Sequence, residues 1–248
     1  MITLYDSDGH KNVMYHDLSE GAMVQANQHL IIDGNEAMLL DPGGHKIYTN
    51  LLSQISLEVA PSALKHIFFS HQDPDIIAAA NGWLMVTDAT AYLSSLWMRF
   101  IPHFGIDSYV VERIKPIPDE GMNLELNGKE IKLIPSHFLH SPGNFQVYDT
   151  QSKTLYTGDL GTSLGQDYYN VENFDDHVQY IEGFHKRYMP SAKALKMWAK
   201  MAGNLDVERI VPQHGAVFPD KAAVEKFIDW VDNLECGLDL MGDSFDVP

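Results

Sequence analysis

The sequence predicts an α/β protein in which two mixed β-sheets are sandwiched between helices. Short apolar stretches typical of strands come in pairs separated by turn residues. Amphipathic helical patterns are interspersed among these pairs. Of the 248 residues, 45% are hydrophobic, which is enough for a full globular core. Strand pairs mixed with helices are typical of layered α/β folds, and α/β chains of this length often form one domain, so we expect one domain over residues 1–248.

The first half of the chain alternates strands and helices. Residues 29–33 and 37–41 are apolar, and Gly34-Asn35 between them predicts a hairpin turn. A helix is expected around Leu51 and Ile55, where apolar residues recur at helical spacing. Residues 66–70 form the next expected strand. Pro74 then fits the first turn of a helix expected over residues 75–82.

The second half contains two more hairpins and three helices. Asn127-Gly128 separates the alternating stretches 123–126 and 130–134, and Gln151-Ser152 separates residues 145–149 from 154–157. Amphipathic helices are expected over residues 174–187 and 191–201. A strand at 209–212 and a helix at 220–235 complete the predicted fold.

Composition excludes several classes of function. The net charge of −17 repels phosphate backbones, so we expect no nucleic-acid partner. No apolar run approaches the roughly 20 residues of a membrane span, so no membrane association is expected. The N-terminus lacks the features of a signal peptide, which predicts a cytoplasmic location. Cys236 is the single cysteine, which excludes an intramolecular disulfide and a metal site built from cysteines.

Polar, metal-ligating side chains follow several predicted strands. His71, Asp73 and Asp75 alternate within five residues directly after the strand at 66–70. Asp159 and His214 also come within three residues of a strand end. Loops at strand ends are where α/β proteins place their sites. A solvated acidic loop or a buried histidine explains any one of these matches alone, so the signal lies in the combination.

The full set adds His140, and its order resembles the metallo-β-lactamase superfamily. That superfamily has an H-x-[HED]-x-D motif followed by spaced His, Asp and His residues. The resemblance runs from about Asn27 to Gly215. It includes Asp41-Pro42-Gly43-Gly44, which matches the first motif of the superfamily. The resemblance implies the αββα sandwich of these proteins, with Asp41 supporting the site from behind the ligands.

Two departures favour iron over the zinc of the superfamily's hydrolases, whose motif is H-x-H-x-D-H. Asp73 replaces the second histidine and Ile76 replaces the last. More carboxylate and less imidazole makes a harder, more anionic site, which suits iron or manganese. Flavodiiron proteins carry a similar substitution, with Glu at the Asp73 position.

Residues 137–144 look like the related oxygen-binding di-iron proteins, which have no flavodoxin domain. Since the chain stops at Pro248, about where a flavodoxin module would begin, we expect a stand-alone diiron domain without FMN.

The resemblance implies a ligand set for two iron ions, with manganese or zinc as metals that purification can introduce. Metal one would take one group of ligands and metal two another, and both would share Asp159. The first group is His71, Asp73, His140 and Asp159, and the second is Asp75, Asp159 and His214. Ile76 cannot ligate, so metal two would keep an open position for dioxygen or nitric oxide.

The histidine of the third motif is ambiguous, because His137 lies three residues before His140. The family pattern favours His140, since the Ser-Pro-Gly segment follows it directly. His137 is then either a partner behind the ligands or a loop residue. The remaining histidines are expected at surface or helix positions rather than at the metals; among them are His29, His45, His103, His177 and His185.

Three functions are compatible with this site, and the sequence does not decide among them. It also leaves open whether the protein is an enzyme. The favoured function is dioxygen or nitric oxide binding for sensing, with a redox or chemotaxis-type signalling partner. The second is a dioxygen or nitric oxide reductase supplied by an external electron donor. The third is a metallohydrolase, most plausibly a phosphodiesterase, because a metal-bound hydroxide can attack phosphate. The resemblance also implies a homodimer.

Overall fold

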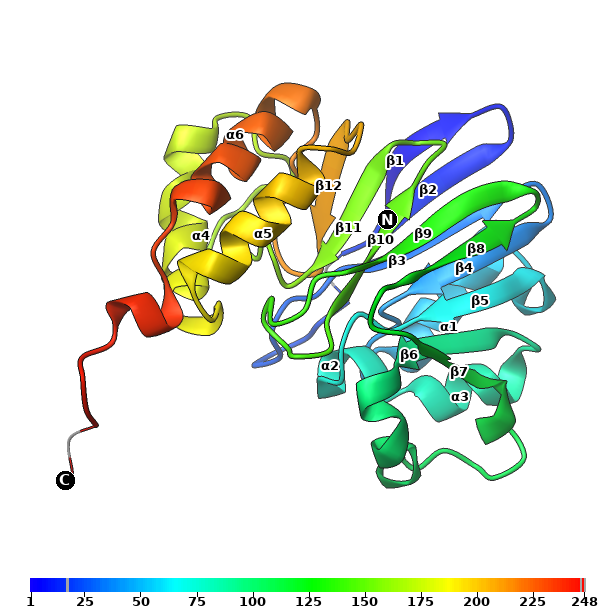
Figure 1. The fold of residues 1–248 in the computed structure, drawn as a ribbon. Coiled ribbons are helices and arrows are strands. Elements are labelled where there is room, and N and C mark those ends of the chain that lie inside the picture. Colours follow the sequence, from blue (N-terminus) through cyan, green and yellow to red (C-terminus); the bar gives the residue numbers. More distant parts are fainter. Residues whose placement is uncertain (17, 246, 248) are drawn as a thin grey trace.

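The computed structural model describes residues 1–16, 18–245 and 247 and contains two mixed β-sheets packed face to face (Figure 1). The larger sheet has the strand order β1-β2-β3-β4-β5-β6-β7. These strands are Ile2–Ser7, His10–Tyr15, Gln28–Asp33, Glu36–Leu40, Leu64–Phe68, Thr90–Ser94 and Ile114–Ile117. The smaller sheet has the order β12-β11-β10-β9-β8. Its strands, from β8 to β12, are Met122–Leu126, Lys129–Pro135, Phe145–Asp149, Thr154–Gly158 and Arg209–Pro212.

Helices cover the outer face of each sheet (Figure 1). The larger sheet is covered by α1 (Tyr48–Glu58) and α3 (Ala80–Val86), and the short α2 (Pro74–Ile77) lies at its edge. The smaller sheet is covered by α4 (Phe174–Tyr188), α5 (Ala192–Ala202) and α6 (Lys221–Asn233). Four 3-10 helices complete the fold: η1 (Pro61–Ala63), η2 (Ser95–Phe104), η3 (Val111–Arg113) and η4 (Gly237–Leu240). None of the helices in the described residues is long and apolar enough to span a membrane.

Three apolar layers hold this arrangement together. One lies between the larger sheet and its helices, with Leu51 and Trp83 at its centre. A second lies between the smaller sheet and its helices, and a third fills the space between the two sheets, around Phe68 and Phe145. Each sheet therefore buries both faces, which explains why strands such as β3 and β10 are buried along their whole length. The predicted αββα sandwich is confirmed.

Most predicted elements are present with bounds that differ by one or two residues. The three hairpins pair in antiparallel register as expected, β3 with β4, β8 with β9 and β10 with β11. Asn127 and Gly128 both have positive φ angles, 48° and 82°, as a tight hairpin turn requires. The predicted helix over 75–82 is wrong in extent, because α2 ends at Ile77 and α3 begins at Ala80.

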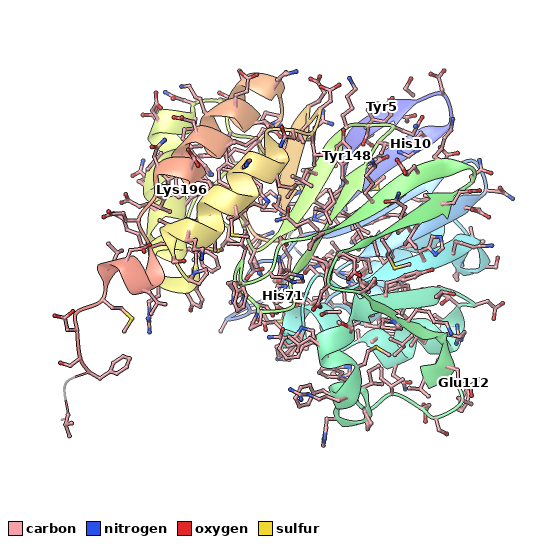
Figure 2. The ribbon with its side chains drawn as sticks, viewed as in Figure 1. Tyr5, His10, His71, Glu112, Tyr148 and Lys196 are labelled. Atoms are coloured by element: carbon pink, nitrogen blue, oxygen red, sulfur yellow. The ribbon has the colours of Figure 1, made fainter. Side chains whose placement is uncertain are left out.

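A buried polar cluster ties the two sheets together at the end of the strands that is far from His71 (Figure 2). His10 of β2 lies between two carboxylates, with Nδ1 2.8 Å from Asp33 and Nε2 2.7 Å from Asp149 of β10. The amide of Asn12 and the hydroxyl of Ser152 also donate to Asp149. Burial lowers the pKa of His10, but the two carboxylates outweigh burial and the pKa is raised. The imidazole of His10 therefore links β2 to β10 across the space between the sheets.

Candidate metal centre

The six predicted ligands lie together at one end of the sandwich, although they come from four separate loops. His71 follows β5, and Asp73 and Asp75 lie at the start of α2. Asp159 follows β11, and His214 follows β12. Because β11 and β12 are parallel, their carboxyl ends deliver both residues to the same edge. The sixth residue, His140, lies in the loop between β9 and β10.

Asp159 lies at the centre of the group and faces three imidazoles. Its Oδ2 is 2.9 Å from Nε2 of His140. Its Oδ1 is 3.5 Å from Nε2 of His214 and 3.9 Å from Nε2 of His71. This Oδ1 is buried and has no hydrogen-bond partner among the described residues. A buried carboxylate oxygen of this kind is costly unless a cation or donor satisfies it.

The other two carboxylates, those of Asp73 and Asp75, lie beside different histidines. Oδ2 of Asp73 is 3.6 Å from Nε2 of His71 and 3.4 Å from Nε2 of His140. One ligand atom from each of these three residues lies within 4.8 Å of the others, as for a shared ion. On the other side of Asp159, Oδ2 of Asp75 is 3.4 Å from Nε2 of His214. The structure therefore brings the six residues close to one another, and their division into two ligand groups stays a prediction.

These separations fit metal ligation. Nitrogen and carboxylate ligands bind first-row metals at about 2.0–2.2 Å, so two ligands of one ion lie about 3–4 Å apart. The distances of 2.9–3.9 Å around Asp159 fall in this range. Three imidazoles and three carboxylates form a mixed, anionic donor set that suits iron or manganese. The residues therefore fit a two-metal centre with Asp159 between the ions.

The electrostatics of the cluster are those of closely packed ion pairs. Burial raises the pKa of Asp159, but its close contacts with the imidazoles of His140 and His214 outweigh burial and hold the pKa well below its usual range. Burial lowers the pKa of the His140 and His214 imidazoles, but the neighbouring carboxylates outweigh burial and raise the pKa to about 10 for His140 and about 9 for His214. Without a cation, protons on the imidazoles balance the carboxylates, and a bound metal takes the place of those protons.

A short hydrogen-bonded chain orients His71 from behind. Nδ1 of His71 lies 3.0 Å from the hydroxyl of Ser70, and the backbone N–H of Ser70 donates to Oδ1 of Asp41 at 2.7 Å. Burial raises the pKa of Asp41 to about 6, and the bond from Ser70 opposes this. When a metal ion is bound at Nε2 of His71, Nδ1 would carry the ring proton, and the hydroxyl of Ser70 is placed to accept it. Asp41 thus acts on the ligand through Ser70.

The segment before β3 orients His214. The carbonyl oxygen of Gln25 lies 2.5 Å from Nδ1 of His214, and its side-chain Oε1 accepts the backbone N–H of Gly215 at 2.8 Å. These bonds point Nε2 of His214 toward Asp75 and Asp159. Sequence reasoning missed Gln25, because a backbone carbonyl carries no residue-type signal. Ser70 could have been found as a polar residue directly before a ligand.

Gly158 allows Asp159 to reach the centre. Gly158 has a φ of 59°, and a Cβ there would lie 3.3 Å from Cβ of Ser70. The left-handed backbone turns the chain sharply between β11 and the ligand. Any side chain at this position would push β11 away from Ser70 and from the His71 loop.

A cavity of about 680 Å³ opens onto the centre and is lined by Asp73, Asp75, His140, Asp159 and His214. Its other walls are largely apolar and include Met23, Val24, Leu164, Phe184 and Tyr188. The ring of Tyr188 meets that of His140 edge-on and stacks on Phe184. The ligands therefore face a mostly apolar chamber.

Two predicted neighbours of the ligands lie elsewhere. Nε2 of His137 is 2.8 Å from the carbonyl oxygen of Asp119, and its ring packs edge-on against Phe145. These contacts fit the loop role and not a role behind the ligands. Ile76 is fully buried in the apolar layer under the larger sheet, because the first turn of α2 points its side chain into the core.

Several of the other histidines do not lie at the positions that were expected for them. His29, His177 and His185 are buried, and burial lowers the pKa of His29 to about 3 and that of the other two to about 4. The surface position expected for His29 is therefore wrong, because β3 is covered on both faces. His45 lines the cavity, which the sequence did not indicate.

The fold is that of a metallo-β-lactamase-like protein, and its cluster of three histidines and three aspartates consists of metal-ligating residue types. The model of the family described as "ODP family beta lactamase" matches residues 24–215. This match covers more than half of the chain, and the chain belongs to that family.

Two solved structures resemble the whole chain. One, "Peroxy diiron species of chemotaxis sensor ODP", is 41% identical, with a TM-score of 0.87 over 96% of this chain and 97% of that one. The other, "Apo state of chemotaxis sensor ODP from T. denticola", is 38% identical, with a TM-score of 0.85 over 96% of each chain. The rubredoxin oxygen:oxidoreductase of Desulfovibrio gigas shares the fold at 16% identity, with a TM-score of 0.76 over 93% of this chain and 62% of that one.

Curated relatives are longer than this chain. An uncharacterized protein of Methanocaldococcus jannaschii is 25% identical over 84% of this chain and 53% of its own length. A relative from Nostoc sp., described as a diflavin flavoprotein A 2, is 25% identical over 75% of this chain and 32% of its own length. The chain thus spans about half or a third of the curated relatives that it matches.

Proposed function

We propose that the chain binds dioxygen at two iron ions and serves as an oxygen sensor. The observation that carries the proposal is the Asp159 carboxylate, whose two oxygens lie between two groups of nitrogen and oxygen ligands. One ion would be held by His71, Asp73, His140 and Asp159, and the other by Asp75, Asp159 and His214. Both solved structures that resemble the whole chain are described as a chemotaxis sensor, and one of them as a peroxy diiron species, which supports this choice of metal and role.

Bound iron would supply a redox-active centre at which dioxygen can be held. The residues of this chain fix the imidazoles through Ser70 and Gln25 and surround the centre with an apolar chamber. Apolar walls such as Met23 and Leu164 favour a small uncharged gas and disfavour bulk water. Nitric oxide is a second ligand of the same chemistry.

The cavity argues against a phosphodiesterase. A phosphate substrate is normally bound by several cations or backbone N–H groups. Among the residues that line this cavity, Lys46 is the single Lys or Arg. The cavity is, however, large enough for a molecule bigger than a diatomic gas. The experiment below therefore also tests for hydrolase activity. A reductase that takes electrons from a partner would use the same site. The stand-alone organisation without FMN, the cytoplasmic location and the signalling partner stay predictions.

The test is metal analysis and optical titration of anaerobically purified protein. We expect two iron ions per chain and a new visible absorption band on addition of oxygen. Asp159→Asn should lose both the second iron and the band, whereas His137→Ala should keep them. Failure to bind iron, or an iron-loaded protein without an oxygen-induced band, would refute the proposal. Sustained oxygen consumption with a reduced rubredoxin would identify a reductase, and hydrolysis of bis-p-nitrophenyl phosphate a phosphodiesterase.

A further inference from the structure

A short chain of hydrogen bonds joins the loop that begins at His71 to the loop that carries His140 (Figure 2 labels His71). The hydroxyl of Ser141, the residue after His140, donates to Oε1 of Gln72 at 2.6 Å. Nε2 of Gln72 in turn donates to Oδ1 of Asp73 at 2.9 Å. We call this chain, from Ser141 through Gln72 to Asp73, the Gln72 bracket.

The direction of each bond in the Gln72 bracket is fixed by the groups that it joins. The ionised carboxylate of Asp73 can only accept, so the NH₂ side of the Gln72 amide faces it. The carbonyl side of the amide therefore faces Ser141, whose hydroxyl donates to it. Ser141 is itself held in place, because it is buried and its carbonyl oxygen accepts the N–H groups of Phe138 at 2.8 Å and Asn144 at 3.1 Å. The position of the His140 loop is thus passed on to Asp73.

The Asp73 carboxylate has two competing uses at this place in the fold. Asp73 is the N-cap residue of α2, and an aspartate there normally accepts a backbone N–H from the first helical turn. Within the described part of the chain, its carboxylate makes no such bond. Oδ1 is instead bonded to Gln72, while Oδ2 lies 3.6 Å from Nε2 of His71 and 3.4 Å from Nε2 of His140. A carboxylate that capped α2 would give up this arrangement.

Asp73 depends on such support because packing restrains it little. Its side chain is 34% exposed, whereas that of Asp159 is 7% exposed. Water reaches the Asp73 carboxylate and competes with the imidazoles for it. A hydrogen bond from Gln72 to one oxygen leaves the other oxygen facing the histidines. The support that burial gives to Asp159 therefore comes to Asp73 from a neighbouring amide.

We propose that Gln72 is a positioning residue of the metal centre, whose amide holds Asp73 toward His71 and His140 and keeps it from capping α2. The inference rests on the proposed metal centre, since Asp73 is one of the candidate ligands, but not on which gas binds there. Gln72 acts through Asp73 and is not itself a ligand. Ser141 supports Gln72, so its effect on metal binding passes through the same amide.

The test is the affinity of anaerobic protein for Fe²⁺ and for Co²⁺, measured against a competing chelator. Gln72→Met keeps a side chain of similar length but removes both bonds of the Gln72 bracket. We expect the affinity for at least one of the two ions per chain to fall about tenfold, as for other residues that orient a ligand. Gln54→Met makes the same exchange on α1, where the amide bonds Asn50, and should leave the affinity unchanged.

A double-mutant comparison tests whether Ser141 acts through Gln72. Ser141→Ala should lower the metal affinity of the wild type. In the Gln72→Met protein, the same substitution should change the affinity less than about twofold, because the amide that it supports is already absent. Equal effects of Ser141→Ala in the two proteins would overturn the chain of action through Gln72.

The thermal midpoint of the metal-free protein separates positioning of a ligand from support of the fold. In Gln72→Met, Asp73 is free to cap α2, so the midpoint should not fall below that of the wild type. A midpoint that falls together with the affinity would overturn the proposal, and so would a metal affinity within about twofold of wild type. Wild-type protein that binds two Co²⁺ ions, but shows no oxygen-induced band with iron, would refute the proposed function alone. Wild-type protein that binds neither metal would overturn both.

Discussion

Replacing Ser70 by alanine removes the hydroxyl that holds His71, and the structure sets the size of the effect. The hydroxyl lies 3.0 Å from Nδ1 of His71, a fully buried ring. Its loss leaves a buried N–H without a partner, which costs about 1–3 kcal/mol. Removal of a partner behind a metal-ligating histidine lowers metal affinity about 10–100-fold, or about 1.4–2.7 kcal/mol. Both estimates agree, so we expect iron affinity to fall by one to two orders of magnitude.

The assay is a competition titration of anaerobic protein against an iron chelator of known affinity. Ser56→Ala, which removes an exposed hydroxyl on α1, is the matched control and should bind iron as the wild type does. The thermal midpoint of the metal-free Ser70→Ala protein shows whether folding is intact. An iron affinity within threefold of wild type would refute the reasoning, because it would mean that Ser70 does not orient the imidazole.

Three further predictions concern the site and the fold. His140→Ala should lose at least one iron per chain in metal analysis, whereas His137→Ala should keep both, since His137 contacts Asp119 instead. Gln25→Ala should lower iron affinity less than threefold, because the bond to His214 comes from the backbone carbonyl. His10→Ala should lower the free energy of unfolding by about 3–5 kcal/mol in denaturant titrations, since Asp149 loses its buried partner. Because the pKa of His10 is raised, this stabilisation is complete below its ordinary value of 6.5 and fades as pH rises through the raised value. A difference between His10→Ala and wild type that grew with rising pH would contradict this sign.

The elements that the sequence predicted are those with regular apolar periodicity or clear turn residues. Among the strands that it missed, β2 has polar residues at buried positions. In β2, the side chains of His10 and Asn12 point between the sheets, where Asp149 satisfies them. Such a strand shows no apolar alternation, and its burial depends on partners more than 100 positions away in the sequence. β7 has only four residues and contains Pro116, which also hides it from pattern reasoning.

The candidate ligands could be predicted because their residue types and spacing are visible in the sequence. The residues that line the apolar cavity could not be predicted in this way. Phe184 and Tyr188 belong to the amphipathic helix α4, where their spacing looks like ordinary packing. Met23 and Val24 lie in a segment with no regular pattern. Their role appears only when folding brings α4 and the segment before β3 to the same cavity.

The position of Ile76 bears on the missing histidine ligand at this position. The sequence suggested that isoleucine leaves an open place on metal two, yet the side chain is packed in the core under the larger sheet. A histidine at position 76 would have to leave that layer or bury an unpaired imidazole, which costs about 1–3 kcal/mol. In this chain the side chain at position 76 therefore contributes to the core and not to the metal site. Asp75 and His214, the residues proposed to hold the second ion with Asp159, both line the cavity.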